Sequence, residues 1–253
     1  MDSIIKNRKR LFSMLLAALF WVALWHFLFI IVDSDLLVPS PYKTIITLIA
    51  MVRKKVFWQS IASSIVRITG GYIVAMLAGC TLGILSGRIR MIKTLFDPFI
   101  RIVRAAPVAS FIVLALVWIK TNILPAFISS LIVIPLFYSN MQDACFRIDK
   151  KMTELCDVMN VSFKDRYSAC IQPAFLPAFK NASVNAIGLA WKSGIAAEII
   201  CRPHLALGTI LGNGKNTLET SEVFAVTLVI ILLSMVFDTV MRTVWGNKND
   251  PNK

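Results

Sequence analysis

Six apolar stretches recur along this chain, and they constrain its fold more than any other feature of the sequence. They fall at residues 11–32, 61–86, 105–119, 123–141, 182–200 and 223–240. A helix needs about 20 apolar residues to cross the hydrocarbon core of a bilayer. Hydrophobic residues make up 57% of the chain and charged residues only 16%, a balance that disfavours a water-soluble domain. The sequence predicts an all-α membrane protein with six transmembrane helices.

The basic residues indicate how these helices are oriented. Most of the 27 lysines and arginines lie in one alternating set of segments, which includes the two ends of the chain and the region around residue 150. Basic residues flanking transmembrane helices stay in the cytoplasm. We therefore expect both termini and segment 145–173 to be cytoplasmic. The net charge of +13 is spread over separate segments, so the sequence does not favour a nucleic-acid partner.

The order of the spans divides the chain into four parts. Residues 1–36 are expected to form a cytoplasmic tail and the first transmembrane helix, residues 61–245 the core that contains segment 145–173, and residues 246–253 a C-terminal tail. Residues 37–60 are predicted to form an extracytoplasmic amphipathic helix at the membrane interface, because apolar residues recur there at helical spacing. These are Ile45, Ile46, Leu48, Ile49 and Val52.

Small residues recur every four positions in the second apolar stretch. They are Ala75, Gly79, Gly83 and Gly87. Residues at this spacing share one helix face, and small side chains let a second helix approach closely. We expect this face to pack against another helix of a bundle.

One polar interruption between the fourth and fifth stretches is too hydrophilic to cross the membrane. Between residues 150 and 159, apolar residues at Met152, Leu155, Val158 and Met159 share a helix face, while charged residues occupy the others. This pattern predicts a short amphipathic helix. Because an exposed apolar face is usually covered by a partner, we expect this helix to sit in a groove of another protein.

The residues after this helix predict a tight turn and a second short helix. Asn160 is suited to the left-handed conformation that ends helices. Ser162 stands three residues before Asp165, a spacing typical of a helix N-cap. Pro173 is expected to break the second helix.

At this point the chain resembles the transmembrane permease subunits of binding-protein-dependent ABC importers. Their cytoplasmic signature is E-A-A, three residues, G, nine residues, then I-x-L-P. Here Glu154-Leu155-Cys156, Asn160 and Cys170-Ile171-Gln172-Pro173 occupy those places with the spacing intact, although only Glu154 and Pro173 are the family's own residues. Segments elsewhere resemble the nitrate, sulfonate and taurine branch of the family. Among them are Leu37-Val38-Pro39-Ser40-Pro41, Phe96-Asp97-Pro98, Ala190-Trp191 and Ala197-Glu198-Ile199-Ile200.

The resemblance implies a type I importer bundle in the bacterial inner membrane, with two ATP-binding subunits, a second permease copy as a homodimer, and an extracytoplasmic substrate-binding protein. ATP and magnesium would then be bound by the partner ATPase, with no cofactor on this chain. The short helix would be the coupling helix. The resemblance assigns eight residues to ATPase docking: Glu154, Leu155, Asp157, Val158, Met159, Asn160, Ser162 and Pro173.

The chain lacks the motifs that catalysis would require. Gly212-Asn213-Gly214-Lys215-Asn216 approaches a phosphate-binding loop but ends in Asn and lacks its first glycine. The two histidines and five cysteines form no paired cluster and no CxxC, so neither a metal site nor a disulfide framework is predicted. We expect a non-catalytic subunit that depends on a separate ATPase.

Ionisable residues inside the spans are candidates for the translocation pathway, because a charge in the bilayer costs at least about 2.5 kcal/mol. Lys192 lies in the middle of the fifth stretch with Ser193, Glu198 and Asn185, and we expect these four residues to line the pathway. Lys192 would favour an anionic substrate. The alternative is an ion pair between Lys192 and a carboxylate, either Glu198 or one from another subunit. Arg67 is expected to extend toward the membrane surface.

Three functions follow from these patterns. The first is an ATP-driven import permease for a small anion such as nitrate, a sulfonate or taurine. The second is a related permease for a vitamin or precursor, such as riboflavin or a thiamine pyrimidine. The third is a secondary transporter that uses Glu198 and Lys192 as coupling residues.

Overall fold

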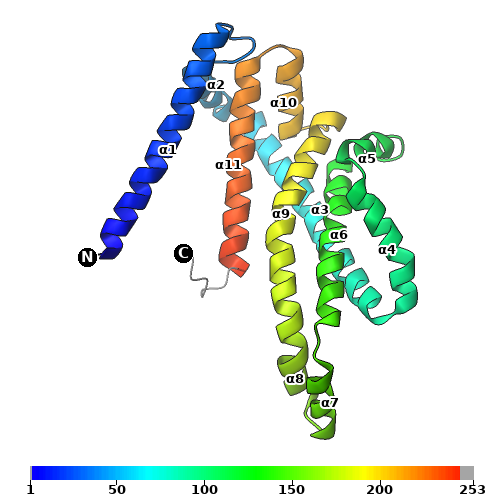
Figure 1. The fold of residues 1–253 in the computed structure, drawn as a ribbon. Helices are drawn as coiled ribbons and strands as arrows, with labels where there is room; N and C mark the ends of the chain where they lie inside the picture. The colour runs from blue at the N-terminus through cyan, green and yellow to red at the C-terminus, as the bar shows by residue number, and fades with distance from the viewer. Residues whose placement is uncertain (1, 246–253) are drawn as a thin grey trace. The chain divides into compact units, whose positions relative to one another are not determined.

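Helices account for nearly all of the described residues. A computed structural model describes the backbone of residues 2–245 and all side chains in this range except those of residues 2–11, 14, 15, 18 and 150. The predicted C-terminal tail, residues 246–253, lies outside the described residues. The elements are α1 (Asp2–Val32), α2 (Pro41–Val52), α3 (Lys55–Arg88), α4 (Arg90–Ala105), α5 (Val108–Ala115), α6 (Leu124–Phe146), α7 (Lys150–Val158), α8 (Phe163–Arg166), a π-helical turn η1 (Tyr167–Ile171), α9 (Gln172–Cys201), α10 (Leu207–Asn216) and α11 (Thr220–Trp245), as labelled in Figure 1.

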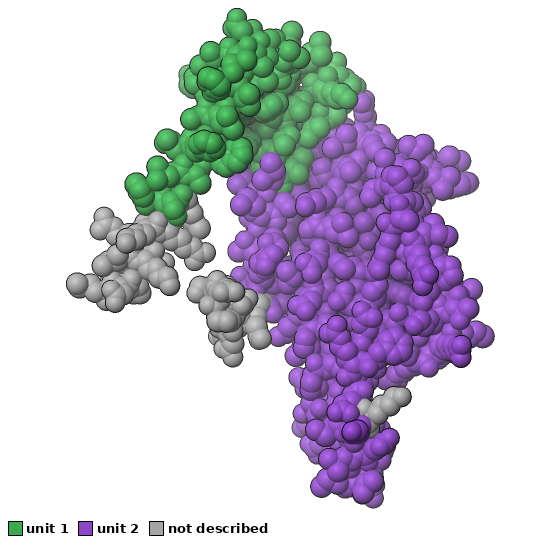
Figure 2. Space-filling view, in the orientation of Figure 1, with its two compact units in different colours: residues 1–58, 210–230 green, residues 59–209, 231–253 purple. Residues whose placement is uncertain are grey.

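The chain divides into two compact units (Figure 2). Unit 1 contains residues 1–58 and 210–230, and unit 2 contains residues 59–209 and 231–253. In unit 1, Trp25 of α1 stacks on Phe224 of α11 with ring centroids 5.5 Å apart. Its indole Nε1 donates a hydrogen bond to the Pro39 carbonyl at 3.1 Å, which ties α1 to the segment that precedes α2.

The predicted interfacial helix is α2. Ser40 is its N-cap and accepts a hydrogen bond from the Lys43 amide, and Pro41 occupies the first helical position, where a missing N–H costs nothing. Thr44 and Met51 are buried, whereas Ile45 and Ile49 are exposed. The structure therefore shows a helix on which the apolar residues Ile45 and Ile49 are exposed, and its location at the membrane surface stays a prediction.

Glycines bring α3 against α6 in unit 2. A Cβ placed on Gly79 would lie 2.7 Å from the Phe137 Cβ, and one on Gly83 would lie 2.5 Å from the Tyr138 carbonyl oxygen. Both distances are shorter than real contacts, so only a hydrogen fits at these positions. Gly87 meets Cys145 in the same way. The close helix approach predicted from the four-residue spacing is confirmed, and α6 is the helix that it contacts.

Four or five of the six predicted spans are found among the described residues. Among the described residues, four segments are long and apolar enough to cross a membrane: α3, α6, α11 and the continuous helical segment Phe163–Cys201. A fifth results if α4 and α5 are counted together, but these two helices are bent by 105° at their junction. The described apolar part of α1, Leu19–Val32, is a shorter helix.

Pro107 explains why residues 105–119 do not form the straight span that was expected. Proline disfavours the helical conformation of the residue before it, and Ala106 is extended, with ψ at 142°. Pro107 is the N-cap of α5, so the chain turns sharply between the two helices. Polar side chains then hold α4 on α6: the Tyr138 hydroxyl donates to Asp97 Oδ1 at 2.6 Å, and Arg104 donates to the Pro135 carbonyl at 2.8 Å.

Candidate functional site

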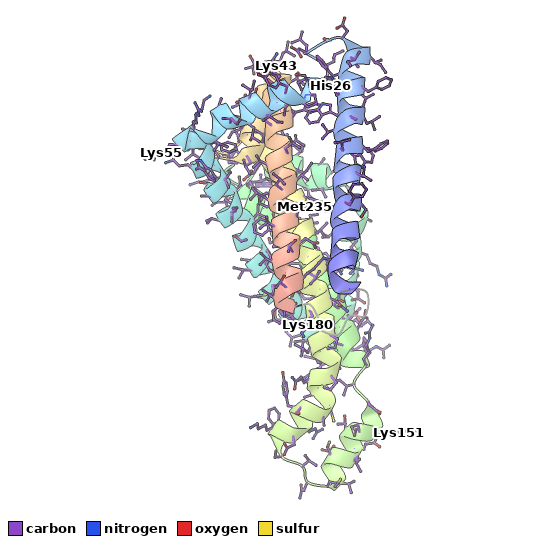
Figure 3. All side chains as sticks on the ribbon, turned by 90° about the vertical axis from the view of Figure 1, so that its left-hand side faces the viewer. His26, Lys43, Lys55, Lys151, Lys180 and Met235 are labelled. Atoms are coloured by element: carbon purple, nitrogen blue, oxygen red, sulfur yellow. The ribbon has the colours of Figure 1, made fainter. Side chains whose placement is uncertain are left out.

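The α7–α8 turn projects from one end of unit 2, beyond the rest of α6 and α9 (Figures 1 and 2). Figure 3 places Lys151 of α7 at this end and Lys180 of α9 farther back along the helix. Asp149 is the N-cap of α7, and its side chain accepts a hydrogen bond from the Lys151 amide at 2.9 Å. The short helix predicted between residues 150 and 159 is therefore present.

The turn after α7 has the geometry that its residues predicted. Asn160 adopts the left-handed conformation, with φ at 52°. The Val161 amide donates to the Cys156 carbonyl at 3.1 Å and the Asn160 amide to the Asp157 carbonyl at 3.3 Å, which together make a Schellman C-cap. Ser162 is the N-cap of α8 and accepts a hydrogen bond from the Asp165 amide at 3.3 Å.

A salt bridge links the two helices across the turn. Arg166 of α8 is hydrogen-bonded to Asp157 of α7. Asp157, which the resemblance assigned to docking, therefore also holds the turn together. Its partner could not be read from the sequence, because the two residues belong to different helices and are brought together only by the turn at Asn160.

Pro173 does not break the second helix. It lies in the first turn of α9, directly after η1, where the Gln172 amide bonds the Tyr167 carbonyl. Proline lacks an N–H and is tolerated at the start of a helix, and the wider π turn accommodates the change of hydrogen-bond pattern. As a result α8, η1 and α9 form one continuous segment of 39 residues.

The projecting turn exposes several large apolar side chains. Val158 is 84% exposed and Phe163 is 80% exposed, and Leu155 and Met159 are also exposed. The remaining residues assigned to docking, Glu154, Asp157, Asn160, Ser162 and Pro173, are exposed as well. We call Leu155, Val158, Met159 and Phe163 the docking patch. An apolar patch of this kind at the end of a membrane protein is typical of a protein interface.

A second candidate site runs along α9. Asn181, Asn185 and Lys192 are exposed, and their positions, with Gly188 between them, lie on one face of the helix because they are four, three and four residues apart. A Cβ on Gly188 would meet no atom within 4 Å. We call these four residues the polar stripe. The sequence analysis did not place Asn181 and Gly188 on this face, although their spacing of four and three residues from Asn185 could have indicated it.

The other two residues expected on the pathway are buried. Ser193 donates to the Leu189 carbonyl of its own helix at 2.9 Å. Glu198 is 0% exposed and lies 3.5 Å from the Arg67 guanidinium. The alternative of a Lys192–Glu198 ion pair is therefore wrong, since the carboxylate of Glu198 faces Arg67. Among the described residues, Lys192 makes no salt bridge.

Glu198 belongs to a polar network at the opposite end of unit 2 from α7. Its Oε2 accepts hydrogen bonds from the Ser64 hydroxyl at 2.8 Å and from the Gly208 amide at 3.1 Å. The Leu207 amide donates to Ser64 Oγ at 3.0 Å. Leu207 and Gly208 begin α10, so the carboxylate lies at a helix N-terminus, where a negative charge is favourable.

Arg67 connects the same network to the loop before α10. Its guanidinium donates to the carbonyls of His204 at 2.6 Å and Leu205 at 3.0 Å. The side chain therefore points into this loop, and its extension toward the membrane surface stays a prediction. A Cβ on Gly208 would lie 2.5 Å from the Glu198 Cβ, so the close approach of α10 to α9 requires glycine there.

Comparison with known proteins agrees with this arrangement. Residues 75–244 match the family described as "Binding-protein-dependent transport system inner membrane component". The bicarbonate transport system permease protein CmpB of Synechococcus elongatus is 26% identical over 187 residues, which are 73% of this chain and 66% of CmpB. The nitrate import permease protein NrtB of Leptolyngbya laminosa is 25% identical over the same shares of the two chains.

A third relative is matched over more of its length. The taurine transport system permease protein TauC of Escherichia coli K12 is 23% identical over 218 residues, which are 83% of this chain and 78% of TauC. For CmpB and NrtB the match spans slightly less than two thirds of the relative. Because the family match covers most of the chain and includes α7 and α9, the chain belongs to the multi-pass inner membrane components of binding-protein-dependent transport systems.

Proposed function

We propose that this chain is the permease subunit of an ATP-driven importer and that its docking patch binds the ATPase. The observation that carries this proposal is the exposed apolar surface of α7 and α8 at a projecting end, where Val158 is 84% exposed. The Schellman turn at Asn160 and the salt bridge between Asp157 and Arg166 connect the two helices that carry the patch. A preorganised helix of this kind loses little entropy when it enters a groove.

The proposed assembly contains two copies of this chain, two ATP-binding subunits and an extracytoplasmic binding protein. The family description names a binding-protein-dependent system, which supports the last of these partners. In this proposal the chain crosses the membrane six times, α1 and the α4–α5 pair included, with both termini and α7 in the cytoplasm. ATP binding would close the ATPase dimer, move α7 and α9 together and switch the bundle between its two states.

We infer that the substrate is a small anion such as bicarbonate, nitrate, a sulfonate or taurine. The names of CmpB, NrtB and TauC support this class. So does the polar stripe, since Lys192 is an exposed cation without a carboxylate partner among the described residues. A lysine in the hydrocarbon of the membrane is costly, so Lys192 would face a water-filled pathway, and the amides of Asn181 and Asn185 would donate hydrogen bonds there.

Docking can be tested by co-purification of this chain with its ATP-binding subunit. Val158→Asp and Leu155→Asp each place a charge in the docking patch, and we expect retention of the ATPase to fall at least about tenfold, since desolvating a charge costs more than about 1.4 kcal/mol. Gln172→Asp is the matched control, because Gln172 is exposed on the same projecting end but lies on α9. Wild-type retention in both patch variants would contradict the docking role.

The substrate class can be tested by uptake into liposomes that contain the complex and its binding protein. Labelled bicarbonate, nitrate, an alkyl sulfonate and taurine would be compared with riboflavin. We expect ATP-dependent uptake of at least one of the anions. Uptake of riboflavin alone would overturn the anion assignment and leave the docking role intact.

A further inference from the structure

Two cysteine thiols meet directly beneath the docking patch. Cys156 of α7 and Cys170 of η1 have their Sγ atoms 3.6 Å apart. They are 8% and 7% exposed. Two other cysteines donate their S–H groups to backbone carbonyls. Cys145 donates to the Ile84 carbonyl at 3.8 Å and Cys201 to the Thr121 carbonyl at 3.6 Å. The sequence had indicated no disulfide, because the two residues are 14 positions apart and form no CxxC motif.

The local structure brings this pair close to bonding geometry. A disulfide bond is about 2.05 Å long, so the two sulfur atoms must approach by roughly 1.5 Å, a shift within reach of side-chain rotation and a small movement of α7. The Schellman turn at Asn160 and the Asp157–Arg166 salt bridge already hold α7 beside η1. The pair therefore needs no rearrangement of the fold.

A cavity gives one of the two thiols access to small molecules. It has a volume of about 380 Å³ and is lined by Cys170 together with Arg147, Met152 and Pro173. Cys156 is not part of the lining, and its hydrogen bond with Cys170 and its burial raise the pKa of the Cys156 thiol. Cys170 is therefore the residue that a solute meets first.

We propose that Cys156 and Cys170 form a reversible disulfide in response to hydrogen peroxide. The Cys170 sulfur attacks one peroxide oxygen, the O–O bond breaks, and the leaving hydroxide takes the Cys170 proton to become water. The resulting Cys170 sulfenic acid is attacked by the sulfur of Cys156, the S–S bond forms, and the S–O bond breaks. The departing hydroxide takes the Cys156 proton and leaves as a second water. Both thiols are oxidised, the peroxide is reduced, and a small-molecule thiol restores the pair by exchange.

The consequence for transport rests on the proposed docking of α7. The disulfide would join α7 covalently to the segment that continues into α9, so that the docking patch could no longer reorient against this helix. In the reducing cytoplasm such bonds are transient and serve as redox sensors. We expect the oxidised complex to lose uptake and to recover it after reduction.

The bond can be tested by peptide mapping of the purified complex. Hydrogen peroxide is added, free thiols are alkylated, and the chain is digested with trypsin, which cleaves at Lys164 and Arg166 between the two cysteines. We expect a linked pair of peptides containing Cys156 and Cys170 that separates on addition of dithiothreitol. Cys156→Ala and Cys170→Ser should abolish the linked pair, and Cys145→Ser should keep it. Full alkylation of Cys156 after peroxide treatment would overturn the proposal.

Uptake measurements separate this inference from the proposed function. Peroxide should reduce uptake by the wild-type complex several-fold and leave the Cys156→Ala complex unchanged; alanine is a suitable variant because the family signature has it at this place. A linked peptide with unchanged uptake would overturn the regulatory role. If no linked peptide forms while Val158→Asp still loses the ATPase, the disulfide is wrong and the docking role stands.

Discussion

Lys192 is the residue whose position bears most directly on substrate choice. It lies on the exposed face of α9 with Asn185, while Glu198, the nearest candidate counter-ion in the sequence, is paired with Arg67. A cation in this position attracts anions with an energy of about 4 kcal/mol at 4 Å when the effective dielectric constant is about 20. Its contribution to transport should therefore be large enough to measure.

Replacing Lys192 with Met should reduce uptake of the anionic substrate at least about tenfold, which corresponds to about 1.4 kcal/mol. The complex should still assemble, because no described residue pairs with Lys192. Lys192→Arg keeps the charge and should retain most of the uptake. Lys180→Met removes a charge from another part of α9 and serves as the matched control. Undiminished uptake by the Lys192→Met complex would show that the stripe does not contact the substrate.

Glu198 should matter for stability and less directly for transport. Glu198→Ala removes the partner of Arg67 and the acceptor of the Ser64 and Gly208 hydrogen bonds. Breaking a buried ion pair from one side costs about 3–5 kcal/mol. We expect a clearly lower unfolding temperature in detergent. Glu198→Gln keeps an acceptor oxygen, so its unfolding temperature should fall by less than that of Glu198→Ala. An Ala variant that unfolds at the wild-type temperature would show that the network is not needed for the fold.

The sequence could predict the conformation of those residues whose contacts lie within a few positions along the chain. Asn160 and Ser162 define a turn through contacts within a few positions, and both have the expected conformation. Glu198 could not be assigned in this way, because Ser64 lies 134 positions away and Arg67 comes from another helix. A buried carboxylate and a carboxylate on a pathway look the same in a sequence, and only tertiary packing distinguishes them.

At the level of elements, the contact between α3 and α6 gives a prediction with an internal control. Gly83→Ala would put a Cβ 2.5 Å from the Tyr138 carbonyl oxygen, whereas a Cβ on Gly70 of the same helix meets nothing within 4 Å. Overpacking typically costs about 1–3 kcal/mol, while Ala is favoured over Gly inside a helix by about 1 kcal/mol. Gly83→Ala should lower the unfolding temperature, and Gly70→Ala should leave it unchanged or raise it. Equal effects of both substitutions would argue against the close approach.

The two prolines at helix junctions show where element boundaries escape sequence analysis. Pro107 was placed inside a span and instead separates α4 from α5, whereas Pro173 was expected to break a helix and instead begins one. The rule that proline lacks a donor is the same in both cases. The outcome depends on the preceding turn: Ala106 is extended, and η1 is helical with a wider hydrogen-bond pattern.

For the whole molecule, the basic residues predict which segments face the cytoplasm. A cysteine in place of Lys164 should react with a membrane-impermeant maleimide only after the cells are opened, and one in place of Lys215 should react in intact cells. Both lysines are exposed, so access is set by the membrane and not by burial. Labelling is compared with the wild-type chain to subtract its own cysteines. The reverse pattern would invert the topology and place the docking patch outside the cell.

The helical and membrane character of the whole chain was evident from sequence because apolar length is a property of each segment alone. The number and bounds of the spans were not evident from the sequence. The α4–α5 bend and the extension of α9 far beyond residues 182–200 depend on tertiary contacts and on the π turn.

The length of this continuous segment has a mechanical consequence. At about 1.5 Å per residue, the 39 residues of Phe163–Cys201 extend to about 58 Å, whereas the hydrocarbon layer is about 30 Å thick. Nearly half of the helix must therefore stand outside the hydrocarbon layer. A partner bound at the α7 end of this segment would be held away from the lipid headgroups. Its affinity for this end should not depend on bilayer thickness or lipid charge.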